Sequence, residues 1–295
     1  MIFRRVFPAF LLALTLPALA LPAFASQHDQ KASAAKPAPG APTPPAGTVK
    51  PPAKPEAIPN PLPADKSVAQ TITVHGKTLH YTATIGTIAL KGKDGKPTGE
   101  VVYTAYTLDS PRDANRPVTF AFNGGPGASS AFLNMGAIGP KHITNFGNQG
   151  DSPSDPATLS DNPNTWLDFS DLVFIDPIGT GFSRSLVPEA QAKKLFYAPT
   201  PDIQYLSLVI YKWLVKNDRL LSKKYLIGES YGGYRGPRVT HYLQTQLGVA
   251  MNGLFLVSPY LNPSFGNGEL SPIPWMITLP SITAAHLENE GKLTP

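Results

Sequence analysis

The sequence has 295 residues, of which 42% are hydrophobic, so it is long enough to bury the core of one large domain. Its formal net charge of +5 comes from basic residues that are scattered along the chain without interleaved aromatic tracts, which argues against a nucleic-acid-binding protein. It contains no cysteine, which excludes disulfide bonds, thiolate metal sites and a cysteine nucleophile.

The N-terminus has the pattern of a secretory signal peptide. Two arginines precede a short apolar run over residues 10–21, and Ala23 and Ala25 are the small residues that precede a cleavage site. A retained membrane anchor is disfavoured, because the run is shorter than the roughly 20 residues that span a bilayer. We expect residues 1–25 to be removed and the protein to be exported, either periplasmic or secreted, without a stable membrane span.

A linker is expected to follow the signal peptide. Residues 26–65 are mostly Ala, Pro and Lys, with hardly a large apolar side chain. Such a segment cannot bury enough surface to offset the entropy of ordering its backbone. It is predicted to be a disordered or polyproline-like tether, which either is passive or spaces the domain from a surface.

The first strands are predicted to form an antiparallel meander. Residues 70–75, 78–90 and 100–108 are rich in Thr, Val, Ile and Tyr with partial alternation. Gly76 and residues 91–97 supply the turns between them.

Short apolar strands and amphipathic helices then alternate. Strands are expected at residues 118–122, 171–175, 224–227 and 254–257. Helices are expected from Pro201, with Thr200 as the N-cap, and over residues 233–247. This alternation predicts an α/β fold with a mostly parallel central sheet that follows the N-terminal meander.

Ser230 is the candidate nucleophile. It is the central residue of the G-x-S-x-G pattern at residues 228–232, between a predicted strand and a predicted helix. In that context the glycines permit a sharp turn that exposes the serine oxygen at the edge of the sheet. The alternative interpretation is a turn serine that bonds its own backbone.

A glycine loop at residues 123–127 follows the strand predicted at 118–122. Such a loop and the residue after the serine, here Tyr231, supply backbone N–H donors for an oxyanion. A phosphate-binding loop is disfavoured, because no G-K-[ST] follows. No metal or organic cofactor is expected, since the H-E-x-x-H zinc spacing is absent as well.

Three sequence blocks carry a specific resemblance. NGGPGASS at residues 123–130, DPIGTGFS at 176–183 and GESYGG at 228–233 resemble the signature blocks of the serine carboxypeptidase family, which are α/β-hydrolases. The resemblance implies that residues 66–272 are the N-terminal part of such a domain, with a sheet that is incomplete at its C-terminal end. Residues 273–295 resemble the start of the helical insertion that caps the family's active site.

The resemblance also implies roles for individual residues. Ser230 would form the acyl-enzyme, and Gly125 and Tyr231 would form the oxyanion hole. The substrate's free carboxylate would be held by Asn123, Gly124 and Glu229. Because Glu229 must be protonated to donate a hydrogen bond, such a site would favour acidic pH.

The sequence also departs from the family pattern. Ala137 occupies the place of a second glutamate that typically shares a proton with the residue before the serine, which weakens the expectation of an acid optimum. Ala128 and Ala121 replace the usual cysteine and tryptophan near the glycine loop.

The base of a catalytic triad has no candidate in the sequence. The family order is Ser, Asp, His, but no aspartate follows Ser230, and only His241 and His286 are downstream histidines. His241 would lie about 16 Å along the same helix, out of reach of the serine. We therefore assign no base, and we expect the 295 residues to be a truncated piece that alone is largely inactive.

The favoured function is a serine-type carboxypeptidase that acts on peptide or protein C-termini. An esterase or acyltransferase on the same scaffold remains open, and so does a non-catalytic peptide-binding or decayed fragment. The oligomeric state is left open.

Overall fold

The computed structural model describes residues 60–109, 115–144, 158–261 and 271–292. The expected signal peptide and the expected linker as far as residue 59 lie outside the described residues.

The N-terminal strands form the predicted antiparallel meander. They are β1 (Lys66–Val74), β2 (Lys77–Lys91) and β3 (Pro97–Leu108), with β2 paired to both others. His75 and Gly76 connect β1 to β2 with φ values of 51° and 77°. A two-residue turn with both φ values positive matches the twist of the strands that it joins.

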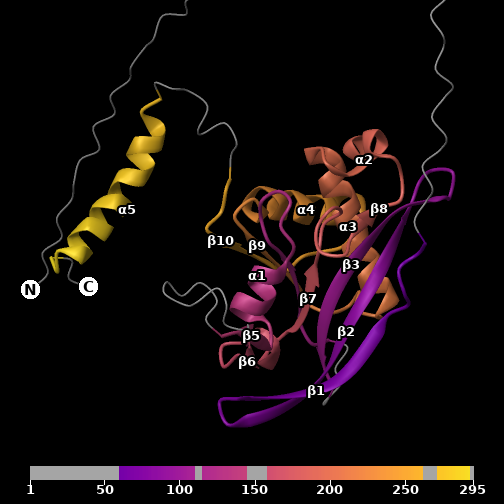
Figure 1. The fold of residues 1–295 in the computed structure, drawn as a ribbon, viewed down its shortest axis with the longest axis horizontal. Helices are drawn as coiled ribbons and strands as arrows, with labels where there is room; N and C mark the ends of the chain where they lie inside the picture. Colours follow the sequence, from indigo (N-terminus) through magenta and orange to yellow (C-terminus); the bar gives the residue numbers. More distant parts are fainter. Residues whose placement is uncertain (1–59, 110–114, 145–157, 262–270, 293–295) are drawn as a thin grey trace, which may run out of the picture. The chain divides into compact units, whose positions relative to one another are not determined.

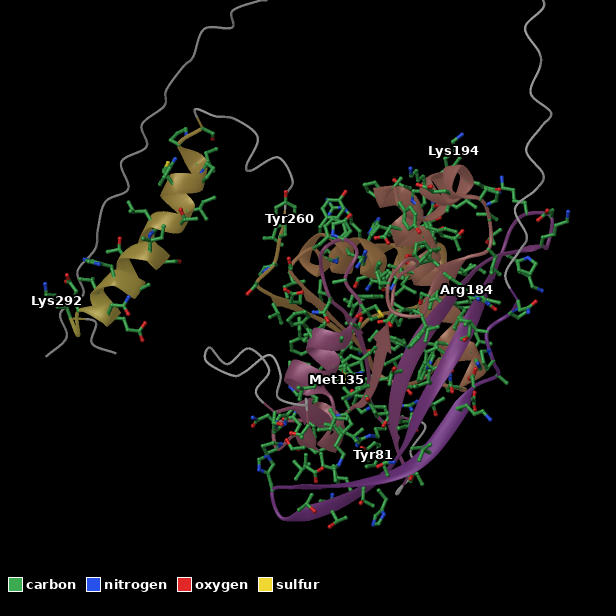
Figure 2. The ribbon with its side chains drawn as sticks, in the orientation of Figure 1. Tyr81, Met135, Arg184, Lys194, Tyr260 and Lys292 are labelled. Carbon is green, nitrogen blue, oxygen red and sulfur yellow. The ribbon has the colours of Figure 1, made fainter. Side chains whose placement is uncertain are left out.

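Ordered contacts begin before β1. The carboxylate of Asp65 accepts hydrogen bonds from the Tyr103 hydroxyl (2.8 Å) and the Lys216 ammonium (2.6 Å). Arg184, labelled in Figure 2, pairs with Glu100 of β3 at 3.0 Å. Asp65, the last residue of the expected linker, is thus hydrogen-bonded to Tyr103 of β3 and to Lys216, which lies in a helix.

The second half of the sheet is parallel, as the sequence predicted. Its strands are β7 (Asp171–Ile175), β4 (Val118–Phe122), β9 (Lys224–Glu229) and β10 (Gly253–Val257), which lie in this order. Because β3 pairs antiparallel with β7, the meander and the parallel strands form one sheet, with the short β8 (Arg184–Ser185) beside β3 (Figure 1). The mixed sheet confirms the α/β class.

Helices α3 (Pro199–Lys216) and α4 (Gly232–Gln246) cover one face of this sheet. Apolar side chains recur along α3 at the helical period and are buried against Phe120 of β4. The Phe120 and Trp213 rings meet edge to face, with their centroids 5.4 Å apart. Helix α2 (Glu189–Phe196) buries Ala192 and Phe196 in the same core.

The other face of the sheet has a smaller core of its own, to which the alternate residues of the strands contribute, such as Ala121 of β4. It is covered by short elements that the sequence did not predict. They are α1 (Ala131–Leu133), a π-helical segment (Asn134–Ile138), a 3-10 turn (Trp166–Asp168) and the hairpin of β5 (Lys141–Ile143) with β6 (Leu159–Asp161).

One predicted helix start is wrong. Helix α3 begins at Pro199 rather than Pro201, and Ala198 is its N-cap without a side-chain cap bond. Proline is well suited to a first helical position, because its missing N–H would have had no partner there. Thr200 therefore lies inside the first turn and is not the cap.

Helix α5 (Ile273–Asn289) falls in the segment that resembles a helical insertion. None of its residues is buried, and Trp275 is 72% exposed. No helix in the described part of the chain is both long enough and apolar enough to cross a membrane.

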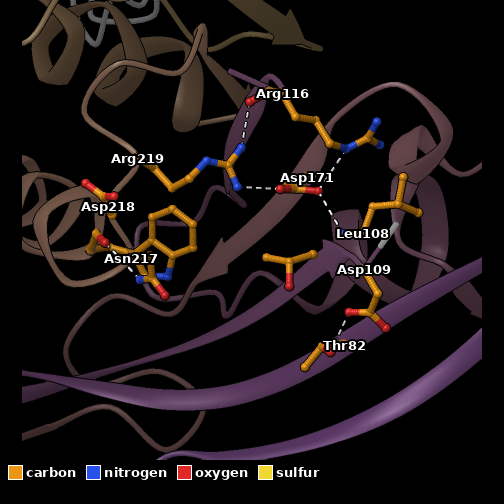
Figure 3. A pocket seen from close by; sticks show the side chains of 10 residues that line it. Thr82, Leu108, Asp109, Arg116, Asp171, Asn217, Asp218 and Arg219 are labelled. Atoms are coloured by element: carbon orange, nitrogen blue, oxygen red, sulfur yellow. Dashed lines mark hydrogen bonds and ion pairs between the residues drawn. The ribbon is translucent and has the colours of Figure 1, made fainter. Parts of the chain in front are cut away.

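A cavity of about 600 Å³ lies at the amino-terminal ends of the parallel strands (Figure 3). At its wall the buried carboxylate of Asp171, which begins β7, accepts hydrogen bonds from Arg116 Nε (3.0 Å) and from Arg219. Arg219 also donates to the Arg116 carbonyl oxygen (2.6 Å). This cluster connects the segments that precede β4, β7 and β9.

Removing one partner of this buried cluster should destabilise the fold strongly. The substitution Arg219→Met would leave Asp171 with one cation fewer and is expected to lower the free energy of unfolding by about 3–5 kcal/mol. Urea unfolding followed by circular dichroism measures the change. The matched control is Lys193→Met, since Lys193 pairs with Glu189 on the exposed side of α2 and its loss should leave the midpoint in place. Equal midpoints for the wild type and Arg219→Met would contradict the assigned role.

Candidate active site

Ser230 lies on the tight turn between β9 and α4, as the sequence predicted. Its φ is 55°, in the left-handed region that is strained for a residue with a side chain. The turn is held by two backbone bonds, from Ser230 N to the Val257 carbonyl (3.0 Å) and from Tyr260 N to the Ser230 carbonyl (2.8 Å). Gly228 is required here, because a Cβ at this position would lie 2.4 Å from the Gly232 carbonyl oxygen.

The glycine loop lies against this turn because β4 and β9 are adjacent parallel strands, whose carboxyl ends meet at one edge. The backbone of Gly124 approaches so closely that a Cβ there would lie 2.6 Å from Ser230 Cβ and 2.7 Å from Tyr231 N. Gly125 has a φ of 105°, which favours glycine. The loop and the Tyr231 N–H thus border the same space beside the serine.

Three further residues that the sequence singled out meet directly. Glu229 Oε2 accepts hydrogen bonds from Asn123 Nδ2 (3.1 Å) and from Gly124 N (3.0 Å). Asn123 is buried, and its Oδ1 accepts the N–H of Leu133 (3.0 Å). A donor amide, a backbone N–H and a carboxyl group therefore converge one residue before the serine.

The block at residues 176–183 is hydrogen-bonded to the segment that follows the glycine loop. Asp176 Oδ1 accepts the N–H of Ser130 (2.8 Å), which is the last residue of the first block. Burial raises the pKa of the Asp176 carboxyl, and the bond from Ser130 opposes this shift. Gly181, with a φ of 52°, is packed so closely that a Cβ there would lie 2.1 Å from Asp176 Oδ2. The second block thus anchors the first.

Ala137 lies in the π-helical segment, where its carbonyl oxygen accepts a hydrogen bond from Asn162 Nδ2 (2.7 Å). Among the described residues, no second carboxyl group is bonded to Glu229. In the described part of the chain, the hydrogen bonds of the Glu229 carboxyl group thus come from Asn123 and Gly124.

No hydrogen bond joins Ser230 to a histidine in the described part of the chain. His241 lies in α4 with its side chain exposed, and His286 of α5 pairs with Glu290 (3.3 Å). His142 Nε2 is within hydrogen-bond distance of Ser160 Oγ (3.0 Å). In the described ranges there is also no cluster of three or more His, Asp or Glu side chains that could hold a metal ion.

One buried charge near the site was not predicted from the sequence. Arg235, in the first turns of α4, is only 1% exposed and forms an ion pair with Asp202 of α3 (2.8 Å). The sequence does contain a sign of this burial. Arg235 lies four residues before Val239 and eight before Leu243, so it shares the apolar face of α4.

Comparison with known proteins shows the family to which the chain is similar. The sequence profile of the family described as serine carboxypeptidase matches residues 96–278. Serine carboxypeptidase-like 36 of Arabidopsis thaliana is 28% identical over 208 residues, which are 68% of this chain and 39% of that protein. Carboxypeptidase S1 of Penicillium janthinellum is 33% identical over 141 residues, covering 44% of this chain and 27% of that protein.

A solved structure gives a weaker likeness. The crystal structure of Kex1Δp, a prohormone-processing carboxypeptidase from Saccharomyces cerevisiae, is 21% identical with a TM-score of 0.45, over 72% of this chain and 48% of that one. The chain thus spans less than half the length of each of these three proteins.

The matched region includes all three sequence blocks and runs from β3 into α5. It covers more than half of the chain, so the assignment does not depend on one motif. The chain belongs to the serine carboxypeptidase family, and its mixed sheet with covering helices is an α/β fold.

Proposed function

We propose that this chain carries the nucleophile and the carboxylate-binding half of a serine-type carboxypeptidase, an enzyme that releases single residues from peptide C-termini. The observation that carries the proposal is the convergence of Asn123 Nδ2, Gly124 N and Glu229 beside Ser230. A site that requires a free carboxylate next to the scissile bond selects the last peptide bond of a chain.

The reaction proceeds through an ester on Ser230. Its Oγ attacks the carbonyl carbon of the last peptide bond while the N–H groups of Gly125 and Tyr231 stabilise the oxyanion. The C–N bond then breaks, and the C-terminal amino acid leaves with a proton. Water hydrolyses the ester and restores the serine hydroxyl. The general base is assigned to no described residue, so turnover is proposed for the protein as its cells make it.

Glu229 changes partners in this proposal. In the structure its Oε2 accepts the bonds from Asn123 and Gly124. A substrate carboxylate would replace it as the acceptor, and Glu229 would then donate from its protonated form. An ionised Glu229 would face the substrate carboxylate with a like charge, so a neutral donor at this position should favour the binding of free peptides.

This mechanism predicts a specific effect of Glu229→Gln. The amide oxygen keeps an acceptor for Gly124, and the amide nitrogen donates at every pH. At a single pH, the KM for a free peptide should therefore be no higher in Glu229→Gln than in the wild type, whereas Glu229→Leu, which cannot donate, should raise it. Ester hydrolysis is the control, since an ester substrate shares the nucleophile and the base but needs no carboxylate site. Equal KM values for the free peptide in Glu229→Gln and Glu229→Leu would contradict the role of Glu229.

An esterase or acyltransferase is the alternative enzyme on this scaffold. It would use Ser230 and the same oxyanion donors, but it would not need the carboxylate set. Competition between peptides and esters separates the two functions. A peptide with a free C-terminus should inhibit ester hydrolysis, whereas the same peptide amidated should not. Inhibition by neither peptide would favour the esterase.

A non-catalytic peptide-binding protein is the alternative from another class. It would keep the carboxylate site without turnover. Isothermal titration of the 295-residue chain with a free and an amidated peptide tests whether the site binds at all. Binding of the free peptide alone, together with no turnover by the protein isolated from its cells, would favour this alternative.

We also propose that the protein is exported to the periplasm or secreted. The proposal is supported by the signal-peptide pattern at residues 1–25, with small residues at the expected cleavage site. N-terminal sequencing of the protein isolated from its cells should give Ser26 as the first residue. A sequence that starts at Met1 would contradict export by this route.

A further inference from the structure

Arg235, in α4, is hydrogen-bonded both to α3 and to the start of the glycine loop beside Ser230. Its guanidinium group donates to Asp202 through Nε (2.8 Å) and Nη2 (3.3 Å), and through Nη1 to the carbonyl oxygen of Asn123 (3.3 Å). We propose that Arg235 is a positioning residue, which orients the Asn123–Gly124 peptide and the ring of Tyr231 and thereby sets the oxyanion site. This inference rests on the proposed function for its effect on catalysis.

The Asn123–Gly124 peptide is held from both sides. In a planar trans peptide the C=O and the following N–H point in opposite directions. The C=O of Asn123 accepts the bond from Arg235, and the N–H of Gly124 donates to Glu229 (3.0 Å). Rotation of this peptide plane would break both bonds. Arg235 therefore fixes the direction in which the glycine loop enters the site.

Tyr231 is held by the same side chain. The guanidinium carbon of Arg235 lies 5.1 Å from the centroid of the Tyr231 ring. The ring also stacks on Tyr234, with centroids 5.3 Å apart at 24°, and the guanidinium of Arg238 lies 3.6 Å from the Tyr234 centroid. The two stacked rings thus lie between two guanidinium groups along the first turns of α4. This stack restrains Tyr231, whose backbone N–H is the second oxyanion donor in the proposed mechanism.

Asp202 makes the buried charge of Arg235 tolerable. Both groups are almost fully buried, and a buried arginine without a counter-charge would be strongly destabilising. The planar fork of arginine bonds both oxygens of Asp202 and still has an N–H for Asn123. A lysine at this position would keep the positive charge, but it could not reproduce the planar set of hydrogen bonds to both oxygens of Asp202 and to the Asn123 carbonyl.

The competing explanation is that the Arg235–Asp202 pair only joins α3 to α4. The chain contains a matched control for that role at the other end of the sheet. Arg219 also pairs with a buried aspartate, Asp171, and also donates to a backbone carbonyl, that of Arg116. Arg219→Lys should therefore remove a buried guanidinium group in the same way, but without affecting the glycine loop.

Hydrogen exchange read by mass spectrometry tests the inference without requiring turnover. In Arg235→Lys, fragments that span residues 122–128 should exchange about tenfold faster than in the wild type, as expected for one lost hydrogen bond. Arg219→Lys should leave these fragments unchanged. Unchanged exchange in a folded Arg235→Lys protein, or equal acceleration in both variants, would overturn the inference.

Kinetics of the protein isolated from its cells supply a second readout. Arg235→Lys should lower kcat for an ester substrate about 10- to 100-fold with little change in KM, because a misplaced oxyanion donor affects the transition state more than substrate binding. A change in KM alone would overturn the inference. If the wild type hydrolyses nothing, the proposed function fails, and the exchange data still decide on the orientation of the loop.

A second variant covers the case in which Arg235→Lys does not fold. The double variant Asp202→Asn with Arg235→Gln neutralises both buried charges together. It should accelerate exchange in residues 122–128 just as Arg235→Lys does. Wild-type protection of this segment in the folded double variant would equally overturn the inference.

Discussion

Replacing Ser230 by alanine is expected to abolish hydrolysis, with a loss in kcat on the order of 10⁴- to 10⁶-fold, as for other serine nucleophiles. The reason is chemical, because the variant has no oxygen with which to form the acyl-enzyme. The free-energy cost of the left-handed φ at this position stays, so the variant should not be much more stable than the wild type. Release of the C-terminal amino acid from a free peptide is the measurement.

The control for this prediction is Ser67→Ala. Ser67 lies in β1, where its hydroxyl is within hydrogen-bond distance of the Thr84 hydroxyl (2.8 Å) on an exposed face. Its loss should leave kcat and KM unchanged. Peptide binding by Ser230→Ala should also persist, because the proposed carboxylate site consists of other residues, Asn123, Gly124 and Glu229. Full activity of Ser230→Ala would remove Ser230 from the mechanism.

The second large effect is expected for Gly124→Ala. The added methyl group would lie 2.6 Å from Ser230 Cβ and 2.7 Å from Tyr231 N, so either the loop or the serine turn must move. Such a displacement removes the alignment of the oxyanion donors, and kcat should fall about 10²- to 10³-fold. The kcat for both ester and peptide hydrolysis should fall, which distinguishes this variant from Glu229→Gln.

Gly248→Ala is the matched control for a strained glycine substitution. Gly248 follows α4 with a φ of 65°, and a Cβ there would meet no atom within 4 Å. This variant should lose stability by about 1 kcal/mol from backbone strain while retaining its kcat. Comparable losses of kcat in both variants would mean that the effect of Gly124→Ala is general destabilisation.

The strands were predictable because their hydrophobic patterns are strong. The apolar runs that became β4 and β7 were predicted with their observed bounds. Each strand has apolar residues on both faces, since it is covered from both sides, and such runs are distinctive in a sequence. The α3 start was wrong because two prolines, Pro199 and Pro201, both suit a first turn, and the sequence alone did not choose between them.

The short elements on the second face were not predictable in the same way. The π-helical segment and the 3-10 turn have five and three residues, too few for a period to appear. Their positions depend on tertiary bonds, such as that from Thr165 Oγ1 to the Ile138 carbonyl oxygen (2.9 Å). Contacts between segments far apart in the sequence carry no local signal.

In the candidate site, too, the residues in a local sequence pattern were predictable, whereas those brought together only by the fold were not. Ser230 and the glycine loop were found because glycine and serine in a strand-to-helix context form a local pattern. The convergence of Asn123, Gly124 and Glu229 came from the family resemblance, and the structure brings these three residues together. Arg235 was missed, because its partners Asp202 and Asn123 are distant in the sequence and become neighbours only through the fold.

The most direct test of the proposed function is the product pattern from one peptide in two forms, free and amidated at its C-terminus. The protein isolated from its cells is incubated with each form, and the products are identified by mass spectrometry. The proposed carboxylate site predicts stepwise loss of single residues from the C-terminus of the free peptide and no cleavage of the amidated one. Internal cleavage, equal hydrolysis of both forms or no cleavage of either would contradict a serine carboxypeptidase.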